Sequence, residues 1–189
     1  MALVILGETT CAISGKIISG KENFLCFPQF LCDPNDPAIV CQDACVLREE
    51  FDKWELGDHV TRRVKEFWSL DYRLREARGT STVVFESNDY LVVKSKVEEK
   101  VRILFLQHVF VIDVPKVTWQ KFCKVLRSES NLIRFSPYSL KTKLIFSKRA
   151  EGVKICLHTQ HIGKDCIQLS PSEWSRFQSI LAAKESLFD

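Results

Sequence analysis

The feature that most constrains the fold is a phrase that occurs twice, with its tryptophans, Trp119 and Trp174, 55 residues apart. The first copy reads DVPKVTWQKFCKVL (residues 113–126) and the second reads QLSPSEWSRFQSIL (residues 168–181). In each copy a proline follows an alternating apolar pattern, and a Trp-x-x-Phe core then begins an apolar stripe at helical spacing. Two such passages predict a repeated structural unit in which strands run directly into a helix.

Alternating segments precede the second copy and predict a sheet. Residues 141–148 and 153–158 place apolar side chains at every second position. Residues 132–135 and 167–169 extend the pattern on either side. Period-two alternation is typical of antiparallel strands that bury one face. We therefore expect four strands before the helix.

The helix after these strands has an explicit start signal. Ser170 is a favourable N-cap residue, Pro171 suits the first helical position, and Glu173 is placed to complete a capping box. Trp174 and Phe177 then begin the apolar stripe. The sequence therefore predicts a strand-rich unit closed by one amphipathic helix.

The same order of elements is predicted 55 residues earlier in the chain. Strand patterns cover residues 82–85, 90–97, 100–109 and 110–114. Trp119 and Phe122 then occupy the positions that Trp174 and Phe177 hold in the second copy. In both units we expect these aromatic residues to be structural, in the core or at an interface between helices.

The first 78 residues fit the pattern less well. Strand-like segments at residues 3–5, 11–18 and 24–27 precede an expected helix over residues 51–74. Trp54 stands 65 residues before Trp119, and Gly57 replaces the second aromatic residue. We expect three segments: a cysteine-rich, degenerate first repeat that ends in a long helix, a second repeat and a third repeat, in residues 1–78, 79–130 and 131–189.

Five of the eight cysteines lie in the first 45 residues. An even number of cysteines is compatible with disulfides, and Cys26, Cys32, Cys41 and Cys45 are candidate zinc ligands. None of their spacings is the short C-x2-C pair of structural zinc sites. The first residues also lack the basic segment of a secretory signal. We therefore expect reduced, largely buried thiols and no cofactor.

Charge is unevenly distributed along a chain whose net charge is only +3. Residues 1–78 carry 10 Lys and Arg against 13 Asp and Glu, whereas residues 131–189 carry 9 against 5. A polyanionic partner is therefore expected to bind the C-terminal segment. No apolar run approaches the roughly 20 residues of a membrane span, so we expect no membrane partner.

The C-terminal unit, in which DCIQLSPSEW (residues 165–174) enters the helix, resembles the single-stranded-DNA-binding domain of the transcriptional coactivator positive cofactor four. That family has a comparable strand and a Pro-acid-aromatic helix start with a tryptophan. The tandem arrangement also resembles Pur proteins and, more loosely, Whirly proteins. The resemblance covers residues 131–189 well, residues 79–130 fairly and residues 1–78 poorly.

The resemblance implies units that dimerise through their helices and hold single strands on their sheets. We therefore expect an α+β protein built from tandem repeats of a curved four-stranded antiparallel sheet followed by one amphipathic helix. Two units in one chain imply an intramolecular pseudo-dimer, and a homodimer of chains is left open.

Single-strand binders combine cations that follow the backbone with planar groups that stack on bases. In the C-terminal unit the expected contacts are Arg134, Phe135, Tyr138, Lys141, Lys143, Lys148, Arg149, Lys154 and His158. In the middle unit they are Lys94, Lys96, Lys100 and Arg102. The alternative is that these residues form the solvated face of a sheet. Because Val92, Leu104 and Leu106 share the middle face, we expect that face to pack against protein.

Enzymatic signatures are lacking. The sequence contains no Gly-rich phosphate loop, Ser-His-Asp signature or paired-carboxylate motif. His158 and His161 would point to opposite faces of a strand. We therefore expect a protein that is not an enzyme.

The predicted function is binding of single-stranded nucleic acid, DNA ahead of RNA, with weak sequence preference. The resemblance implies a role in transcription, replication or genome handling, and an intracellular location, the nucleus ahead of the cytoplasm. The alternative is a protein–protein assembly or structural module that keeps the fold without binding nucleic acid. Residues 1–78 are the candidate region for a protein partner.

Overall fold

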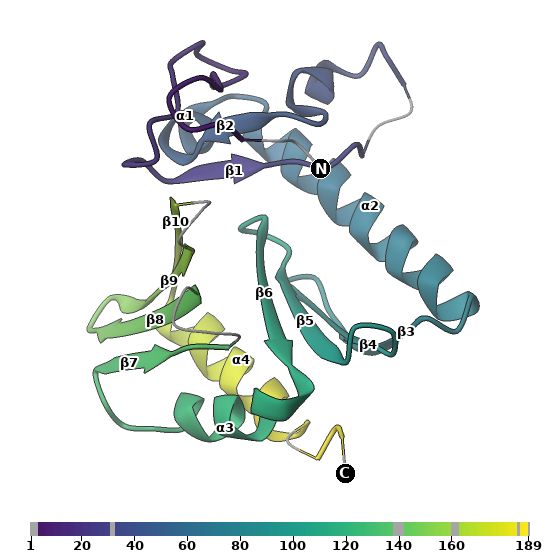
Figure 1. Ribbon diagram of the computed structural model, residues 1–189, viewed down its shortest axis with the longest axis vertical. Coiled ribbons are helices and arrows are strands. Elements are labelled where there is room, and N and C mark those ends of the chain that lie inside the picture. Colours follow the sequence, from purple (N-terminus) through teal and green to yellow (C-terminus); the bar gives the residue numbers. More distant parts are fainter. Residues whose placement is uncertain (1–3, 31–32, 138–141, 160–162, 185, 189) are drawn as a thin grey trace.

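The computed structural model describes residues 4–30, 33–137, 142–159, 163–184 and 186–188. In these residues the chain is an α+β protein with two four-stranded antiparallel sheets, one two-stranded sheet and four α-helices (Figure 1). The predicted α+β class and antiparallel sheets are confirmed. No described helix has both the length and the apolar character that crossing a membrane requires.

Each four-stranded sheet is a meander that runs into a helix. The first sheet contains β3 (Ser81–Glu86), β4 (Tyr90–Ser95), β5 (Lys100–Phe105) and β6 (Phe110–Pro115), and α3 (Lys116–Leu126) follows. The second contains β7 (Leu132–Phe135), β8 (Thr142–Arg149), β9 (Gly152–Thr159) and β10 (Gly163–Leu169), and α4 (Pro171–Ala182) follows. Neighbouring strands in each sheet are consecutive in the chain, as short hairpin connections require.

The start of α4 has the predicted capping box. The Ser170 hydroxyl accepts a hydrogen bond from the Glu173 backbone N–H at 3.3 Å, and the Glu173 carboxylate accepts one from the Ser170 N–H at 2.7 Å. Pro171 occupies the first turn. These contacts satisfy backbone donors that the helix itself leaves unpaired, and so they set the point at which β10 turns into α4.

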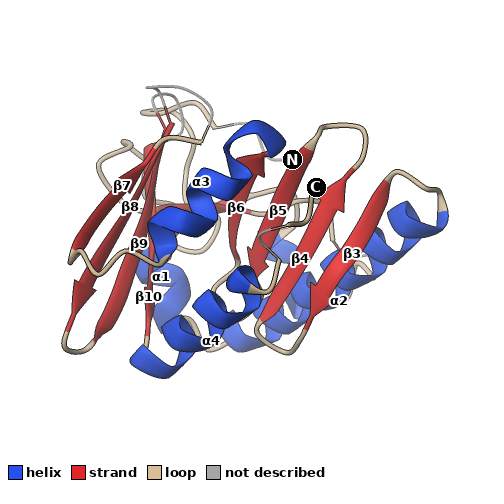
Figure 2. Cartoon of the chain, turned by 90° about the horizontal axis from the view of Figure 1, so that it is seen from below, coloured by secondary structure: helices blue, strands red, loops and turns tan. Residues whose placement is uncertain are grey.

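Helices α3 and α4 lie side by side between the two four-stranded sheets (Figure 2). Phe122 of α3 and Phe177 of α4 are both buried there, as are Trp119 and Trp174. The inner faces of both sheets and both helices form one continuous apolar core. Neither helix therefore belongs to the core of its own sheet alone.

The outer face of the first sheet is covered by protein. Tyr72 and Trp68 of the long helix α2 (Gly57–Ala77) pack against Leu91, Val93 and Leu104 of that face, as Figure 2 shows for the elements. The prediction that this face packs against protein is confirmed for Leu104 and Leu106.

The assignment of Val92 to the outer face with Leu104 is wrong. Tyr90 and Val92 face the inner core, while Leu91 and Val93 face α2. Residues 90–93 are all apolar because both faces of this strand are buried, so alternation could not distinguish the two faces.

The N-terminal segment has fewer strands than expected, and they are short. Its elements are β1 (Phe24–Cys26), the 3-10 helix η1 (Pro37–Cys41), β2 (Cys45–Leu47), α1 (Arg48–Lys53) and α2. Within the described part of residues 3–18 the only ladder contact is a single bridge between Thr10 and Ile17. The expected strand at 11–18 and the described part of the one at 3–5 are therefore not formed.

The single helix expected over residues 51–74 is two helices, α1 and α2. The chain leaves α1 at Trp54 and resumes helical structure at Gly57. A side chain at Gly57 would place its Cβ 2.9 Å from the Phe51 carbonyl oxygen, so only glycine fits this close approach. Phe51, Val60 and Val64 then join a separate N-terminal core around Phe27.

Candidate nucleic-acid interface

The outer face of the second sheet consists of cross-strand rows. Lys143 of β8 lies directly opposite His158 of β9. A second row runs Arg134, Ile145, Cys156, Cys166, and a third runs Leu132, Ser147, Lys154, Gln168. At alternate positions of these strands, Phe146 and Ile155 face α3 and α4 and are fully buried.

This outer face is basic. Arg134, Lys143 and Lys154 are exposed, and no Asp or Glu occupies an outward position of the described residues in these strands. Arg149 lies at the end of the β8–β9 hairpin, where its guanidinium is 3.7 Å from the Glu151 carboxylate. Lys154 lies opposite Ser147 of β8. Ser147 is four residues from Lys143, so the rows that contain Lys143 and Lys154 are about 13 Å apart along the strand. The cations are therefore spread across the sheet.

The remaining predicted contacts of this unit lie elsewhere. Phe135 is buried on the inner face, with its ring centroid 5.1 Å from that of Phe122, so its predicted stacking role does not fit this structure. Lys148 also faces inward, where its ammonium bonds the Ser128 carbonyl oxygen and lies 6.0 Å from the Trp174 ring. Tyr138 and Lys141 lie outside the described residues.

His158 is half-buried and is the one imidazole or aromatic ring at a described outward position of the second sheet. Arg134 offers a planar guanidinium on the same face. Both groups can stack on a nucleobase, although neither matches the area of a tyrosine or phenylalanine ring.

The cations predicted in the middle unit are mostly engaged within the protein. Arg102 forms two hydrogen bonds to Asp113, at 2.6 and 2.7 Å, and Lys100 forms an ion pair with Asp113 at 2.9 Å. Lys94 donates to the Leu187 carbonyl oxygen at 2.8 Å and lies over the Phe188 ring. Lys96 is exposed beyond the end of β4. Because α2 covers this sheet, these residues do not form a second open face.

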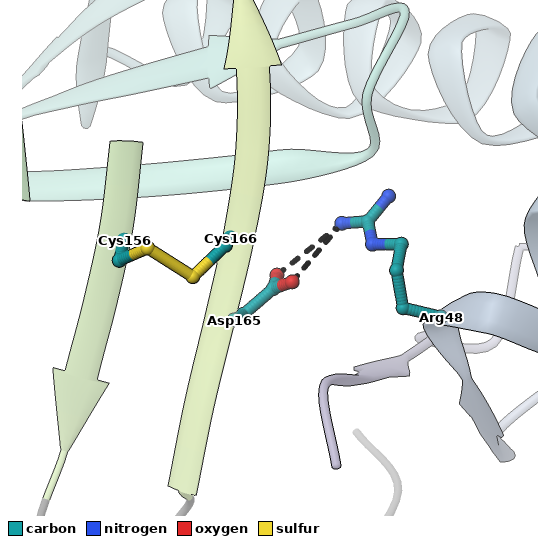
Figure 3. Close-up of a disulfide and its surroundings, with 4 residues drawn as sticks. All are labelled: Arg48, Cys156, Asp165 and Cys166. Atoms are coloured by element: carbon teal, nitrogen blue, oxygen red, sulfur yellow. Dashed lines mark hydrogen bonds and ion pairs between the residues drawn. A yellow bond between two sulfur atoms is a disulfide. The ribbon is translucent and has the colours of Figure 1, made fainter. Parts of the chain in front are cut away.

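A disulfide joins Cys156 of β9 to Cys166 of β10 on the outer face of the second sheet (Figure 3). The expectation of reduced thiols is therefore wrong for this pair. The two residues are directly opposite in an antiparallel ladder, which brings their side chains within bonding reach. Both are buried although they lie on the outer face.

The edge strand β10 is held to the N-terminal segment by an ion pair. The Arg48 guanidinium lies 3.2 and 3.4 Å from the two carboxylate oxygens of Asp165, as drawn in Figure 3, and donates to the His108 carbonyl oxygen at 2.8 Å. Burial raises the pKa of Asp165 to about 6, and Arg48 only partly offsets this shift. Arg48 and Asp165 are 117 residues apart, and no local pattern indicated their contact.

A cavity of about 450 Å³ opens beside this ion pair. Its lining includes Asn23, Arg48, His108, Lys154 and Gln168. Burial lowers the pKa of His108 despite the Glu173 carboxylate 3.5 Å from its Nε2, so the imidazole is neutral at physiological pH. Lys154 and Gln168 also belong to the outer face, and the cavity therefore continues that face around the β10 edge.

Of the four candidate zinc ligands, the three that the structure describes are not gathered into one site. Cys26 and Cys45 are opposite each other on β1 and β2, and Cys41 is buried in η1. Cys32 lies outside the described residues. In the part of the chain that the structure describes, no three His, Cys, Asp or Glu side chains converge as metal ligands.

Comparison of the chain with protein-family models, with curated proteins and with solved structures finds no significant match. The resemblance to single-strand-binding proteins therefore rests on the sequence motifs alone, and functional inference depends on the residues described above.

Proposed function

We propose that the protein binds single-stranded nucleic acid, without enzymatic activity, on the outer face of the second sheet. The observation that carries the proposal is the cross-strand arrangement of Arg134, Lys143 and Lys154 on a face with no described acidic position. Unlike the outer face of the first sheet, this one is not covered by a helix in the described chain.

The proposed mechanism is mainly electrostatic. Lys143 and Lys154 contact phosphates of an extended strand that crosses the sheet, and His158 and Arg134 provide planar groups for bases. Phosphate contacts and stacking carry little base information, so sequence preference is weak. The sequence resemblance favours DNA over RNA and a nuclear role in transcription, replication or genome handling.

The architecture we propose is a pair of tandem units packed as an intramolecular pseudo-dimer. Support comes from the matched order of four strands and one helix, and from the shared core between the sheets. In such a pseudo-dimer α2 blocks the outer face of the first unit. One chain then offers one binding face instead of two.

Charge reversal tests the binding face. Lys143→Glu combined with Lys154→Glu replaces two exposed cations and is expected to weaken binding of a labelled single strand of ~20 nucleotides by at least about 100-fold in fluorescence anisotropy. Wild-type protein is expected to bind the single strand more tightly than the matching duplex.

The matched control is Lys121→Glu with Lys124→Glu. Both lysines are exposed on α3, and this change alters the net charge by the same amount on another part of the surface. Equal losses of affinity in the two double variants would mean that total charge, and not this face, governs binding. Absence of wild-type binding at low salt would reject the proposal.

The rival function is a protein-assembly module. The packing of α2 favours this function, because it shows that the outer face of a sheet of this type can bind a helix, here one of the same chain. Under this function the outer face of the second sheet docks a protein segment, and wild-type protein shows no affinity for single strands at any salt concentration.

A further inference from the structure

Cys26 and Cys45 form a second cross-strand cysteine pair. They are directly opposite in the antiparallel pair of β1 and β2, and their sulfur atoms are 2.7 Å apart. This separation exceeds the roughly 2.05 Å of a covalent S–S bond by less than an ångström. A small side-chain movement therefore suffices to join them.

The arrangement is the same as that of the existing disulfide. Cys156 and Cys166 are also directly opposite on adjacent antiparallel strands. The strands that carry the two pairs are neighbours, because β1 packs beside β10 (Figure 1). Arg48 and Asp165 form an ion pair at this junction (Figure 3). One pair is oxidised and the other is a dithiol in otherwise equivalent geometry.

Access and acidity differ between the two thiols of the N-terminal pair. Cys26 is half-buried, so a small reagent can reach it, whereas Cys45 is 3% exposed. The hydrogen bond from the Cys26 thiol lowers the pKa of Cys45 and raises the pKa of Cys26, so Cys45 holds the thiolate and Cys26 the shared proton. The accessible sulfur thus lies beside the better resolving nucleophile.

We propose that Cys26 and Cys45 are a redox-active dithiol that closes to a second disulfide by exchange with small disulfides such as oxidised glutathione. The Cys26 thiol passes its proton to the neighbouring Cys45 thiolate as the Cys26 sulfur attacks one glutathione sulfur, which forms a mixed disulfide and releases one glutathione thiolate. Cys45 then gives that proton to the released glutathione, and the Cys45 thiolate attacks the Cys26 sulfur and releases the second glutathione. Two protein thiols and one small disulfide become one protein disulfide and two small thiols.

Closure would link β1 covalently to β2 next to the strand that carries Asp165. The state of the pair follows the compartment, since a reducing cytosol or nucleus keeps dithiols open and an oxidising compartment closes them. The inference is independent of nucleic-acid binding, because it rests on the N-terminal sheet alone.

The test is a redox titration of the full-length protein with mixtures of reduced and oxidised glutathione. Free thiols are blocked with iodoacetamide, disulfides are then reduced and labelled with N-ethylmaleimide, and peptides are quantified by mass spectrometry. Cys26 and Cys45 are expected to change label together, and non-reduced digests are expected to contain the linked Cys26–Cys45 peptide. Cys123, buried in α3, keeps the thiol label throughout.

Two further measurements separate a true pair from general oxidation. In Cys26→Ser protein, Cys45 is expected to keep its free thiol in mixtures that oxidise the wild-type pair completely. Phenylarsine oxide, which bridges two adjacent thiols, is expected to protect both cysteines of the reduced wild-type protein from iodoacetamide. Independent labelling of Cys26 and Cys45, or a linked peptide that joins either to another cysteine, would overturn the inference.

Discussion

Phe122 of α3 and Phe177 of α4 each pack against the four-stranded sheet that does not directly precede their own helix. The Phe122 ring lies 5.1 Å from Phe135 and 6.3 Å from Phe146, centroid to centroid, in the second sheet. The Phe177 ring lies 5.7 Å from Tyr90 and 5.0 Å from Phe105, in the first sheet. Because the exchange is reciprocal, the stability of each sheet depends on the helix that follows the other.

Phe177→Ala is expected to destabilise the protein by about 3–5 kcal/mol, because it leaves a cavity in the shared core. The loss should appear in urea unfolding as one transition that includes both sheets. Val117→Ala, at a side chain that is 90% exposed on α3, is the control and should change stability by less than about 0.5 kcal/mol. Two separate transitions in Phe177→Ala protein would show that the sheets unfold independently.

Neutralising Arg102 should lower stability, whereas neutralising Lys143 should lower affinity for the single strand, although both residues are cations on sheet faces. Arg102→Gln removes the paired hydrogen bonds to the partly buried Asp113, so it is expected to cost about 2–3 kcal/mol of stability. Its effect on single-strand affinity should be small. Lys143→Gln should lower affinity and change stability by less than about 0.5 kcal/mol. Thermal unfolding and anisotropy on both variants check the contrast, which fails if Arg102→Gln weakens binding as Lys143→Gln does.

The raised pKa of Asp165 predicts a specific pH dependence. The folded protein holds this proton up to a pH of about 6, whereas the unfolded chain loses it near pH 4. Its contribution to stability is therefore fully present below pH 4 and is lost as pH rises to about 6. Wild-type stability relative to Asp165→Asn should fall by about 1–3 kcal/mol over this interval, measured by urea unfolding. A rise with pH would mean that attraction to Arg48 outweighs burial.

The Cys156–Cys166 disulfide closes a short loop, with a sequence separation of 10. Loops of this size predict a stabilisation of about 2–3 kcal/mol. Cys156→Ser with Cys166→Ser should lower the free energy of unfolding by that amount without reductant. Single-strand affinity of the folded double variant should stay within about twofold, because Lys143 and Lys154 are retained. A loss of more than tenfold would indicate that the disulfide positions the basic face.

Local signals in the sequence were sufficient for several elements. The start of α4 was predictable because Ser170, Pro171 and Glu173 act within one turn of the helix. The strands of both four-stranded sheets were predictable because their turns are short and at least one face of each is apolar. The break at Gly57 was missed, since it depends on the approach of the Phe51 carbonyl oxygen in the folded chain.

The candidate site was less predictable, since it depends on which face of each sheet stays open. Phe135 and Arg134 are neighbours on opposite faces of a four-residue strand, too short a stretch for alternation to decide. The sequence alone does not indicate that Arg102 has an acidic partner, because Asp113 lies opposite it only in the register of β5 and β6. The Arg48–Asp165 pair requires a contact between segments that carry no shared local pattern, and the Cys156–Cys166 disulfide depends on the register of β9 against β10.

The most direct test of the nucleic-acid interface is the salt dependence of single-strand affinity for wild-type, Lys143→Gln and Lys121→Gln protein. Phosphate contacts from Lys143 and Lys154 predict that log affinity falls with log salt with a slope of about −1.4, reduced in magnitude by about 0.7 in Lys143→Gln and unchanged in Lys121→Gln. Equal slopes for all three proteins, or no binding of the single strand at low salt, would contradict a binding site on the outer face of the second sheet.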